Sequence, residues 1–417
     1  MFKSNLNTVP EINFVKTFGG SKNDVAQAII NTNDNGYAVL GHTQSADFDI
    51  NNKDNDSFDY WLLKFDKEQN LEWSKTYGGS DDDRGRDIIQ TNDNGFLLTG
   101  FSRSSDGDVS TNNGNYDFWT LRLDASGIIL WEKSFGFLGS DQGYTITKTS
   151  DNGFLLGGSI DVSASGGQGN SKSQHAGGDF WLIKIDENGT KLWSRYYGGL
   201  FTDSLYDIVE TDTGDFMLVG SSDSSDTDIS NNIGDYDFWV IKVDKNGTKI
   251  WEKSFGGTQP DESFSIVKTN DNHFLIVGNS RSLDVNVSEN LGSSDIWLIK
   301  INEAGELLWE KSFGGSNFET AKNISKSNQG FYITGSSRSA DFDVIKNEGN
   351  KDIWIVKLDE NGTLVWSKSI GGTNLDEANS ILETANNGIV LVGESWSLDK
   401  EITENKGFSD VVIINLK

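Results

Sequence analysis

The chain of 417 residues contains no cysteine, which excludes disulfide bonds, thiolate metal sites and a cysteine nucleophile. Proline occurs twice and histidine three times. No apolar run reaches the roughly 18 residues that a membrane-spanning helix needs, so we expect no membrane insertion. Positive charge is also scarce: 35 Lys and Arg stand against 63 Asp and Glu, a formal net charge of −28. This balance disfavours nucleic acid and anionic lipid surfaces as partners.

Hydrophobic residues are few, but aromatic residues make up 11% of the chain, and one sequence unit that contains them occurs seven times. Each unit begins with an aromatic anchor, followed two residues later by Lys or Arg and then, in most units, by Phe-Gly or Tyr-Gly. The anchors are Phe14, Trp73, Trp131, Trp193, Trp251, Trp309 and Trp366. An isoleucine follows 15 residues after every anchor. Repetition at this period indicates a repeat architecture.

The repeat predicts four short strands, A to D. One such set covers 207–212, 215–221, 237–244 and 249–256, and its D strand contains the next anchor. The turns from A to B and from C to D contain Asn-Gly or related pairs, which supply the positive φ of a hairpin. No stretch has helical periodicity. Seven units of four antiparallel strands predict an all-β, seven-bladed β-propeller, with an open β-solenoid as the alternative.

The two ends of the chain are complementary in this scheme. The chain starts with a D-type strand at 12–18 and ends with a C-type strand at 410–416, so the seventh blade lacks an outer strand that the N-terminus can supply. We expect this strand to close the ring and to hide a sheet edge. We therefore predict an N-terminal lead at 1–10 and a single domain at 11–417.

The units resemble the tandem β-propeller repeats of surface and secreted proteins of Bacteroidota. The shared phrases are W-x-K-x-F-G-G at 251–257, T-x-D-x-G-F/Y-x-x-x-G-x-S-x-S at 211–225 and D-x-W-x-x-K-x-D-x-x-G at 237–247. The resemblance covers almost the whole chain and implies a non-catalytic binding or display module outside the cell. The chain departs from the usual layout of that group in two ways: 1–13 lacks the apolar region of a signal peptide, and no C-terminal sorting domain follows the repeats.

Successive loops of a propeller alternate between its two faces, so the D–A and B–C loops share one face. These loops hold 38 acidic and 11 basic residues, a formal charge of −27. The sequence thus assigns nearly the whole net charge to one face of the ring.

Seven acidic residues recur ten positions after the anchors: Asp24, Asp83, Asp141, Asp203, Asp261, Glu319 and Asp376. They precede the innermost strand, which predicts a ring of carboxylates near the mouth of the channel. Two interpretations are open: the ring holds a cation or a basic partner, or each carboxylate accepts backbone N–H bonds within its own loop.

A second acidic pattern, Asp-x-Asp, occurs in four B–C loops: Asp47/Asp49, Asp106/Asp108, Asp226/Asp228 and Asp341/Asp343. Closely spaced carboxylates and loop carbonyls suit Ca²⁺, although no loop matches an EF-hand. The alternative is an Asx-turn or solvated role. The Asp before each strand C is interpreted as structural. The strand-C cations Lys64, Arg122, Lys184, Lys242, Lys300 and Lys357 are expected to pair across the C–D hairpin, for example with Asp66 or Asp359.

Departures from the repeat are the places to look for chemistry. Trp396 stands where other units have Arg103, Arg281 and Arg338, and an exposed Trp there could bind a sugar or a protein. The B–C loop at 159–178 is the longest and contains His175. The three histidines occupy non-equivalent positions, so they suggest no zinc site and no Ser-His-Asp triad.

The sequence therefore favours a monomeric, non-enzymatic binding or scaffold module whose acidic loop face meets a protein or glycan. The alternatives are a calcium-stabilised structural repeat domain, and a hydrolase or lyase with a site at the central channel.

Overall fold

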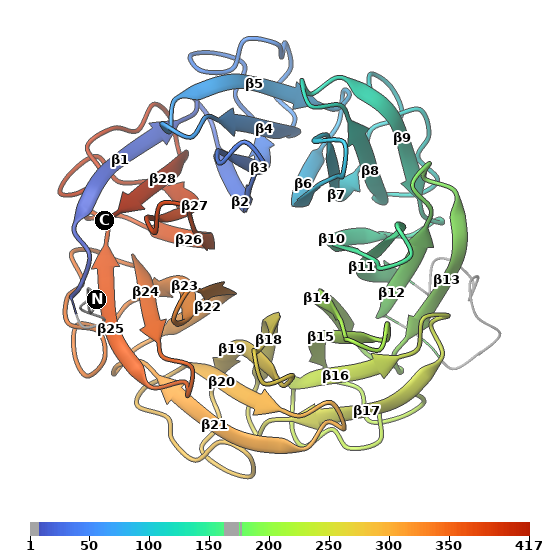
Figure 1. The fold of residues 1–417 in the computed structure, drawn as a ribbon, viewed down its shortest axis with the longest axis vertical. Helices are drawn as coiled ribbons and strands as arrows, with labels where there is room; N and C mark the ends of the chain where they lie inside the picture. Colours follow the sequence, from blue (N-terminus) through green and yellow to red (C-terminus); the bar gives the residue numbers. More distant parts are fainter. Residues whose placement is uncertain (1–7, 162–174, 176) are drawn as a thin grey trace.

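The protein forms a closed ring of seven blades, described here from a computed structural model that covers residues 8–161, 175 and 177–417 (Figure 1). Within these ranges the chain contains 28 β-strands arranged as seven four-stranded antiparallel sheets. The predicted seven-bladed propeller is confirmed, and the solenoid alternative is wrong. The described ranges contain no helix long and apolar enough to cross a membrane.

Blades one to three consist of β2 (Asp24–Asn31), β3 (Tyr37–Thr43), β4 (Asp59–Phe65), β5 (Leu71–Tyr77), β6 (Asp83–Gln90), β7 (Phe96–Ser102), β8 (Asp117–Leu123), β9 (Ile129–Phe135), β10 (Gln142–Lys148), β11 (Phe154–Asp161), β12 (Gly178–Ile185) and β13 (Lys191–Tyr197). Blades four to six consist of β14 (Asp203–Glu210), β15 (Phe216–Ser222), β16 (Asp237–Val243), β17 (Lys249–Phe255), β18 (Asp261–Lys268), β19 (Phe274–Ser280), β20 (Asp295–Ile301), β21 (Leu307–Phe313), β22 (Glu319–Ser327), β23 (Gly330–Ser337), β24 (Asp352–Leu358) and β25 (Leu364–Ile370). Blade seven consists of β26 (Asp376–Glu383), β27 (Ile389–Ser395), β28 (Asp410–Leu416) and β1 (Ile12–Phe18).

The N-terminal strand closes the ring, as the sequence predicts. Strand β1 pairs antiparallel with β28 and completes blade seven as its outer strand (Figure 1). The start of β1 and the end of β28 are paired as in a hairpin. The N–H of Glu11 donates to the carbonyl of Lys417 at 2.9 Å, and the N–H of Lys417 donates to the carbonyl of Glu11 at 3.0 Å. The last C strand is therefore paired on both sides and presents no free edge.

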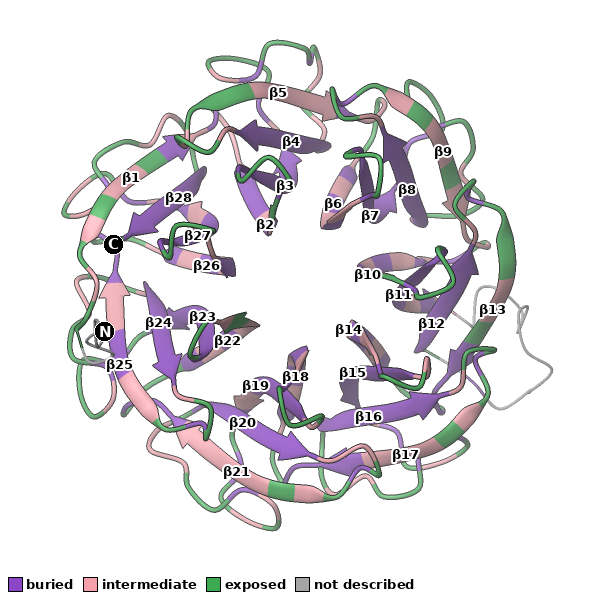
Figure 2. Ribbon diagram, in the orientation of Figure 1, coloured by how far each residue is buried: buried purple, intermediate pink, exposed green. Residues whose placement is uncertain are grey.

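The hydrophobic core lies between neighbouring blades. Most C strands begin with Asp, an aromatic or aliphatic residue and Trp, and the last two of these pack against the adjacent blades. Successive residues of a strand point to opposite faces, so the aromatic residue and the Trp reach different neighbours. The ring centroids of Tyr60 and Trp119 lie 4.7 Å apart, and those of Phe180 and Trp239 lie 4.5 Å apart, each pair joining two blades. The middle strands are buried and the outer strands alternate between exposed and half-buried residues (Figure 2).

A β-bulge interrupts every innermost strand at the same place. In β2 the pairing register with β3 shifts between Ala26 and Ala28, and equivalent shifts occur in the other six A strands. A bulge strengthens the local twist and leaves one residue without a ladder partner. Gln27 is that residue in blade one, and the innermost strands, which carry its equivalents, surround the central channel (Figure 1).

Candidate functional site

The D–A and B–C loops meet on one face of the ring, here called the loop face. In blade one the N–H of Ser21 donates to Oδ1 of Asp47 at 2.8 Å, which joins the β1–β2 loop to the β3–β4 loop. The same bond recurs between Ser80 and Asp106, Leu200 and Asp226, Thr258 and Asp284, Ser316 and Asp341, and Thr373 and Asp399. The two loop sets thus form a single surface.

The seven acidic residues at the predicted ring are the first residues of the innermost strands, or directly precede one, and none has measurable solvent exposure. Asp261 is typical: its Oδ2 accepts the N–H of Gly257 at 2.7 Å and the hydroxyl of Ser282 at 2.8 Å. The equivalent backbone bond measures 2.7 or 2.8 Å in all seven units. These contacts agree with the interpretation in which each carboxylate accepts hydrogen bonds within its own loop. A partner could not reach the carboxylates without opening the loops.

Each of these side chains faces a second carboxyl across the junction between two blades. The second one is the Asp that begins strand C of the preceding blade. The pairs are Asp410/Asp24, Asp59/Asp83, Asp117/Asp141, Asp179/Asp203, Asp237/Asp261, Asp295/Glu319 and Asp352/Asp376, here called the junction carboxyls. The first member typically accepts a backbone N–H through Oδ2, as Asp237 does from Ile233 at 2.5 Å.

Burial raises the pKa of thirteen of the fourteen junction carboxyls, and repulsion within several of the pairs adds to it. The pKa of Asp203 rises to about 8 and that of Asp237 to about 7. Among the described residues, Oδ1 of the strand-C member accepts no hydrogen bond at any of the seven junctions, although Oδ1 of Asp59 lies 3.5 Å from Nζ of Lys53. Of the 38 acidic residues of the loops, the fourteen junction carboxyls and Asp228 are buried, which lowers the exposed charge of the loop face below the sequence estimate.

The first glycine of the Phe-Gly-Gly phrase is required at these junctions. A Cβ placed on Gly256 would lie 2.1 Å from Oδ1 of Asp237 and 2.7 Å from Oδ2 of Asp261, closer than atoms can approach. We expect Gly256→Ala to lower the free energy of unfolding by about 1–3 kcal/mol, the usual cost of overpacking. Chemical denaturation measures it. Gly178→Ala is the control, because a Cβ there meets nothing within 3.7 Å, and equal losses in the two variants would contradict the prediction.

The Asp-x-Asp residues bind backbone N–H groups of the adjoining loop. Asp47 binds Ser21, and Asp49 Oδ2 accepts the N–H of Gly19 at 3.0 Å. Asp228 forms an ion pair with Lys249 at 2.9 Å. Within the described residues, no group of three or more His, Cys, Asp or Glu side chains is arranged to hold a metal ion.

The residue between the two acidic positions, or between Asp284 and Asn286 in blade five, adopts a left-handed backbone conformation. Phe48, Val285 and Phe342 have φ angles of 53°, 55° and 52°. Positive φ is unfavourable for a bulky or β-branched side chain, so the paired carboxylate–backbone bonds must hold it. These three side chains are nevertheless 65–67% exposed to solvent. The loops therefore maintain a strained backbone while presenting apolar groups to water.

Further exposed apolar side chains lie on the corresponding loops of consecutive blades. With Phe48, Val285 and Phe342 they form a set here called the apolar arc, which runs over blades five, six, seven and one: Leu283, Val285, Phe342, Ile345, Leu398, Phe408 and Phe48. All are at least 62% exposed. Exposed apolar side chains on a face that also carries many acidic residues make this face a candidate interaction surface.

Trp396 and His175, which the sequence singled out, are not among the exposed residues of the loop face. Trp396 is half-buried, and its carbonyl accepts the side-chain amide of Asn374 at 3.0 Å. His175 is buried, with Nδ1 2.5 Å from Oδ2 of Asp179. Most of the loop at 159–178, namely 162–174 and 176, lies outside the described residues.

The strand-C cations pair mainly with carboxylates of the A–B turns, on the opposite face of the ring. The predicted pairing across the C–D hairpin is found for Lys64, whose Nζ lies 2.9 Å from Glu72 of β5, but not with the predicted partner Asp66. Lys64 lies 2.7 Å from Asp34, in the A–B turn, whereas Asp66 accepts the N–H of Asn70 at 2.8 Å. The A–B turn folds back beside the end of strand C, so its carboxylate reaches the cation. Spacing along the sequence could not reveal this.

The central channel has an asymmetric lining that sequence reasoning missed. The bulged residues of neighbouring blades touch in series: Arg86 donates to Gln27 and lies 5.7 Å from the ring of Tyr144, which lies 5.5 Å from Tyr206, which lies 5.1 Å from Phe264. Burial lowers the pKa of Arg86. The sequence contained one indication of this lining. The residue 13 positions after each anchor differs in type from unit to unit, although the rest of the A strand is regular.

Comparison with known proteins supports the propeller fold but no specific function. No protein-family model matches the chain, and the search of curated proteins found no match. The WD40 domain of Pan2 from Neurospora crassa has a TM-score of 0.50 and 9% identity, over 95% of this chain and 89% of that domain. Sqt1 from Chaetomium thermophilum has a TM-score of 0.47 and 13% identity, over 96% and 87%. A Dyadobacter fermentans protein of unknown function has a TM-score of 0.47 and 10% identity, over 98% of each chain.

Proposed function

We propose that this chain is a non-enzymatic binding module, of the kind that the Bacteroidota repeat proteins resembling it provide, and that its loop face binds a protein partner. The observation that supports this proposal most strongly is the apolar arc. Phe48, Val285 and Phe342 occupy equivalent positions on three blades and are exposed in spite of an unfavourable backbone conformation. Strain of this kind persists where the surrounding structure enforces it, and it clusters at functional sites.

The charge of the loop face indicates the chemistry of the partner. The acidic residues of these loops that are not junction carboxyls still outnumber the 11 basic residues. A partner surface with basic and apolar side chains would complement both the charge and the apolar arc. Rigid blades hold the loops through repeated backbone bonds, which lowers the entropy lost on binding.

The test uses a phage-displayed random peptide library as the probe. We expect selected peptides to be rich in Lys, Arg and aromatic residues, and to bind more weakly as salt rises from 50 to 500 mM. The variant Phe48→Ser/Val285→Ser/Phe342→Ser should weaken their binding at least tenfold, because central apolar side chains dominate interface energies. Titration calorimetry measures the dissociation constants.

The matched control is Leu130→Ser/Ile250→Ser/Leu308→Ser, which alters equally apolar residues, 43–55% exposed, on the outer strands. This control should leave binding within twofold of the unaltered chain. Equal binding to both triple variants would contradict the proposal. A glycan array run in parallel identifies the other outcome, because glycan binding without peptide binding would replace the protein partner.

A further inference from the structure

Five blades follow one rule on the face opposite the loop face. The cation near the end of strand C forms an ion pair with a carboxylate of the A–B turn in its own blade. The distances are 2.7 Å for Lys64–Asp34, 2.6 Å for Arg122–Asp93, 2.9 Å for Lys184–Asp151, 3.1 Å for Lys242–Asp215 and 2.7 Å for Lys300–Asp271. In these five blades the chain therefore supplies a turn carboxylate for the buried strand-C cation.

Blade six breaks this rule. Its A–B turn, Ser327-Asn328-Gln329-Gly330, is one residue shorter than that of blade one and contains no acidic residue. Lys357 in β24 is 5% exposed and donates to the hydroxyl of Ser327. Its Nζ lies 4.0 Å from the ring centroid of Tyr332. No ion pair joins Lys357 to an acidic side chain among the described residues.

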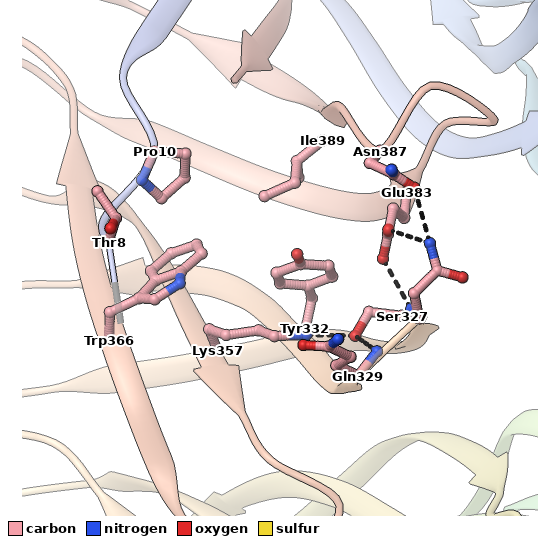
Figure 3. A pocket seen from close by; sticks show the side chains of 11 residues that line it. Thr8, Pro10, Ser327, Gln329, Tyr332, Lys357, Trp366, Glu383, Asn387 and Ile389 are labelled. Atoms are coloured by element: carbon pink, nitrogen blue, oxygen red, sulfur yellow. Dashed lines mark hydrogen bonds between the residues drawn. The ribbon is translucent and has the colours of Figure 1, made fainter. Parts of the chain in front are cut away.

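The missing carboxylate leaves room beside the ammonium group. Figure 3 shows the cavity, with Lys357 between Tyr332 and Trp366 and with Pro10 and Ile389 on the far wall. Its volume is about 280 Å³, near the lower end of the range for small-molecule sites. Trp366 and Ile389 are buried side chains of blades six and seven. The cavity thus combines one buried cation with aromatic and aliphatic walls.

Two glutamates contribute negative charge near this cavity. Glu383 lines it and is held by Asn328, whose backbone N–H donates at 2.9 Å and whose side-chain amide donates at 2.7 Å. Glu360 approaches from the end of strand C and interacts with the ammonium more weakly. Burial lowers the pKa of Lys357 to about 8, although both glutamates act to raise it. Their negative charge disfavours a dianion such as phosphate and admits a ligand with one carboxylate.

We propose that the cavity at Lys357 binds a small monocarboxylic acid with an aromatic or branched aliphatic body. The ligand carboxylate takes the place on Lys357 that the turn aspartate takes in the five other blades. The apolar body lies against Trp366 and Ile389. This site is on the opposite side of the ring from the apolar arc, so it is independent of the protein-binding role.

The probes are acetate, benzoate, 3-phenylpropionate and indole-3-acetate, tested by titration calorimetry and by NMR line shifts. We expect 3-phenylpropionate or indole-3-acetate to bind with a dissociation constant below about 1 mM, and the amide of the same acid to bind at least tenfold more weakly. Affinity should fall as pH rises through about 8, because the carboxylate prefers the protonated lysine.

Two variants separate the site from a general structural effect. Lys357→Met should abolish the difference between acid and amide. Ser327→Asp should also weaken binding at least tenfold, because it places an intramolecular carboxylate beside Lys357, as in the other blades, and it keeps the lysine. Its melting temperature should not fall. Equal affinity for acid and amide, unchanged binding in Ser327→Asp, or no binding of any probe at 10 mM overturns the proposal.

Discussion

A chain that begins at Gly20, and so lacks strand β1, is expected to lose at least about 4 kcal/mol of its free energy of unfolding. Phe14 and Phe18 of β1 are half-buried against the cluster that contains Trp61 and Val411, and loss of the two together is comparable to loss of one fully buried phenylalanine, which typically costs that much. The deletion also removes the hydrogen bonds to β28 and exposes its edge. Urea denaturation with tryptophan fluorescence measures the loss, and light scattering should reveal association through the free edge.

A circular permutant provides the control for this deletion. It carries residues 20–417, a five-residue turn copied from 359–363, and then residues 11–19, so that the same strand follows β28 as a hairpin. Because Glu11 and Lys417 already exchange backbone hydrogen bonds, this connection should restore stability to within about 1 kcal/mol. If the deleted chain unfolds at the same urea concentration as the full chain, β1 does not close the ring.

The thermal stability of the protein is expected to fall as pH rises from 5 to 7.5. The junction carboxyls have raised pKa values in the folded state, and Asp59, Asp237, Asp295 and Asp352 each reach about 7. An unfolded chain releases these protons near pH 4. The folded state therefore binds more protons in this range, and its advantage is lost as pH passes through the folded-state pKa values.

The expected slope follows from the number of retained protons. Each proton held only by the folded state lowers the free energy of unfolding by about 1.4 kcal/mol per pH unit, and we expect at least that slope. His42 acts in the opposite direction, because burial, with the nearby Arg86 and Arg84, lowers its pKa well below the usual value, but it is one group against thirteen. Calorimetry at half-unit pH steps, with proton uptake measured in buffers of different ionisation enthalpy, tests this.

Single substitutions assign the effect to the junctions. Asp237→Asn removes one of the two carboxyls at its junction, so the slope should become shallower by up to one proton and stability at pH 7.5 should not fall. Asp93→Asn is the control, because hydrogen bonds from Thr91 and Arg122 lower the pKa of Asp93 to about 2 and its charge is constant in this range. A stability that rises between pH 5 and 7.5 would contradict the prediction.

Local sequence was sufficient to predict the strands and their order. The terminal strands occur at the predicted residues 12–18 and 410–416, because their aromatic and β-branched residues adjoin glycine-containing loops. The innermost strands begin about four residues earlier than predicted, as at Asp203 instead of 207. The bulge in each A strand explains this difference, because it interrupts the alternation on which the prediction relied.

The candidate sites were less predictable, because their partners lie on other strands or blades. Asp261 faces Asp237 across a blade junction, so sequence spacing could suggest a ring of carboxylates but not that each is buried against a second one. The exposure of Phe48 and Phe342 depends on a positive φ that no propensity favours. Lys357 follows the same sequence pattern as Lys300, and its lack of a carboxylate becomes visible once the A–B turn is placed beside it.

The sequence by itself determined the repeat, the four strands of each unit, the closure of the ring and the assignment of the acidic loops to one face. These depend on backbone preferences and hydrophobic alternation within about 60 residues. The tertiary structure decided which carboxyls are buried, which cations are paired and which apolar side chains remain exposed. Burial and pairing are set by distances between neighbouring strands and blades, and identical local phrases acquire different environments there.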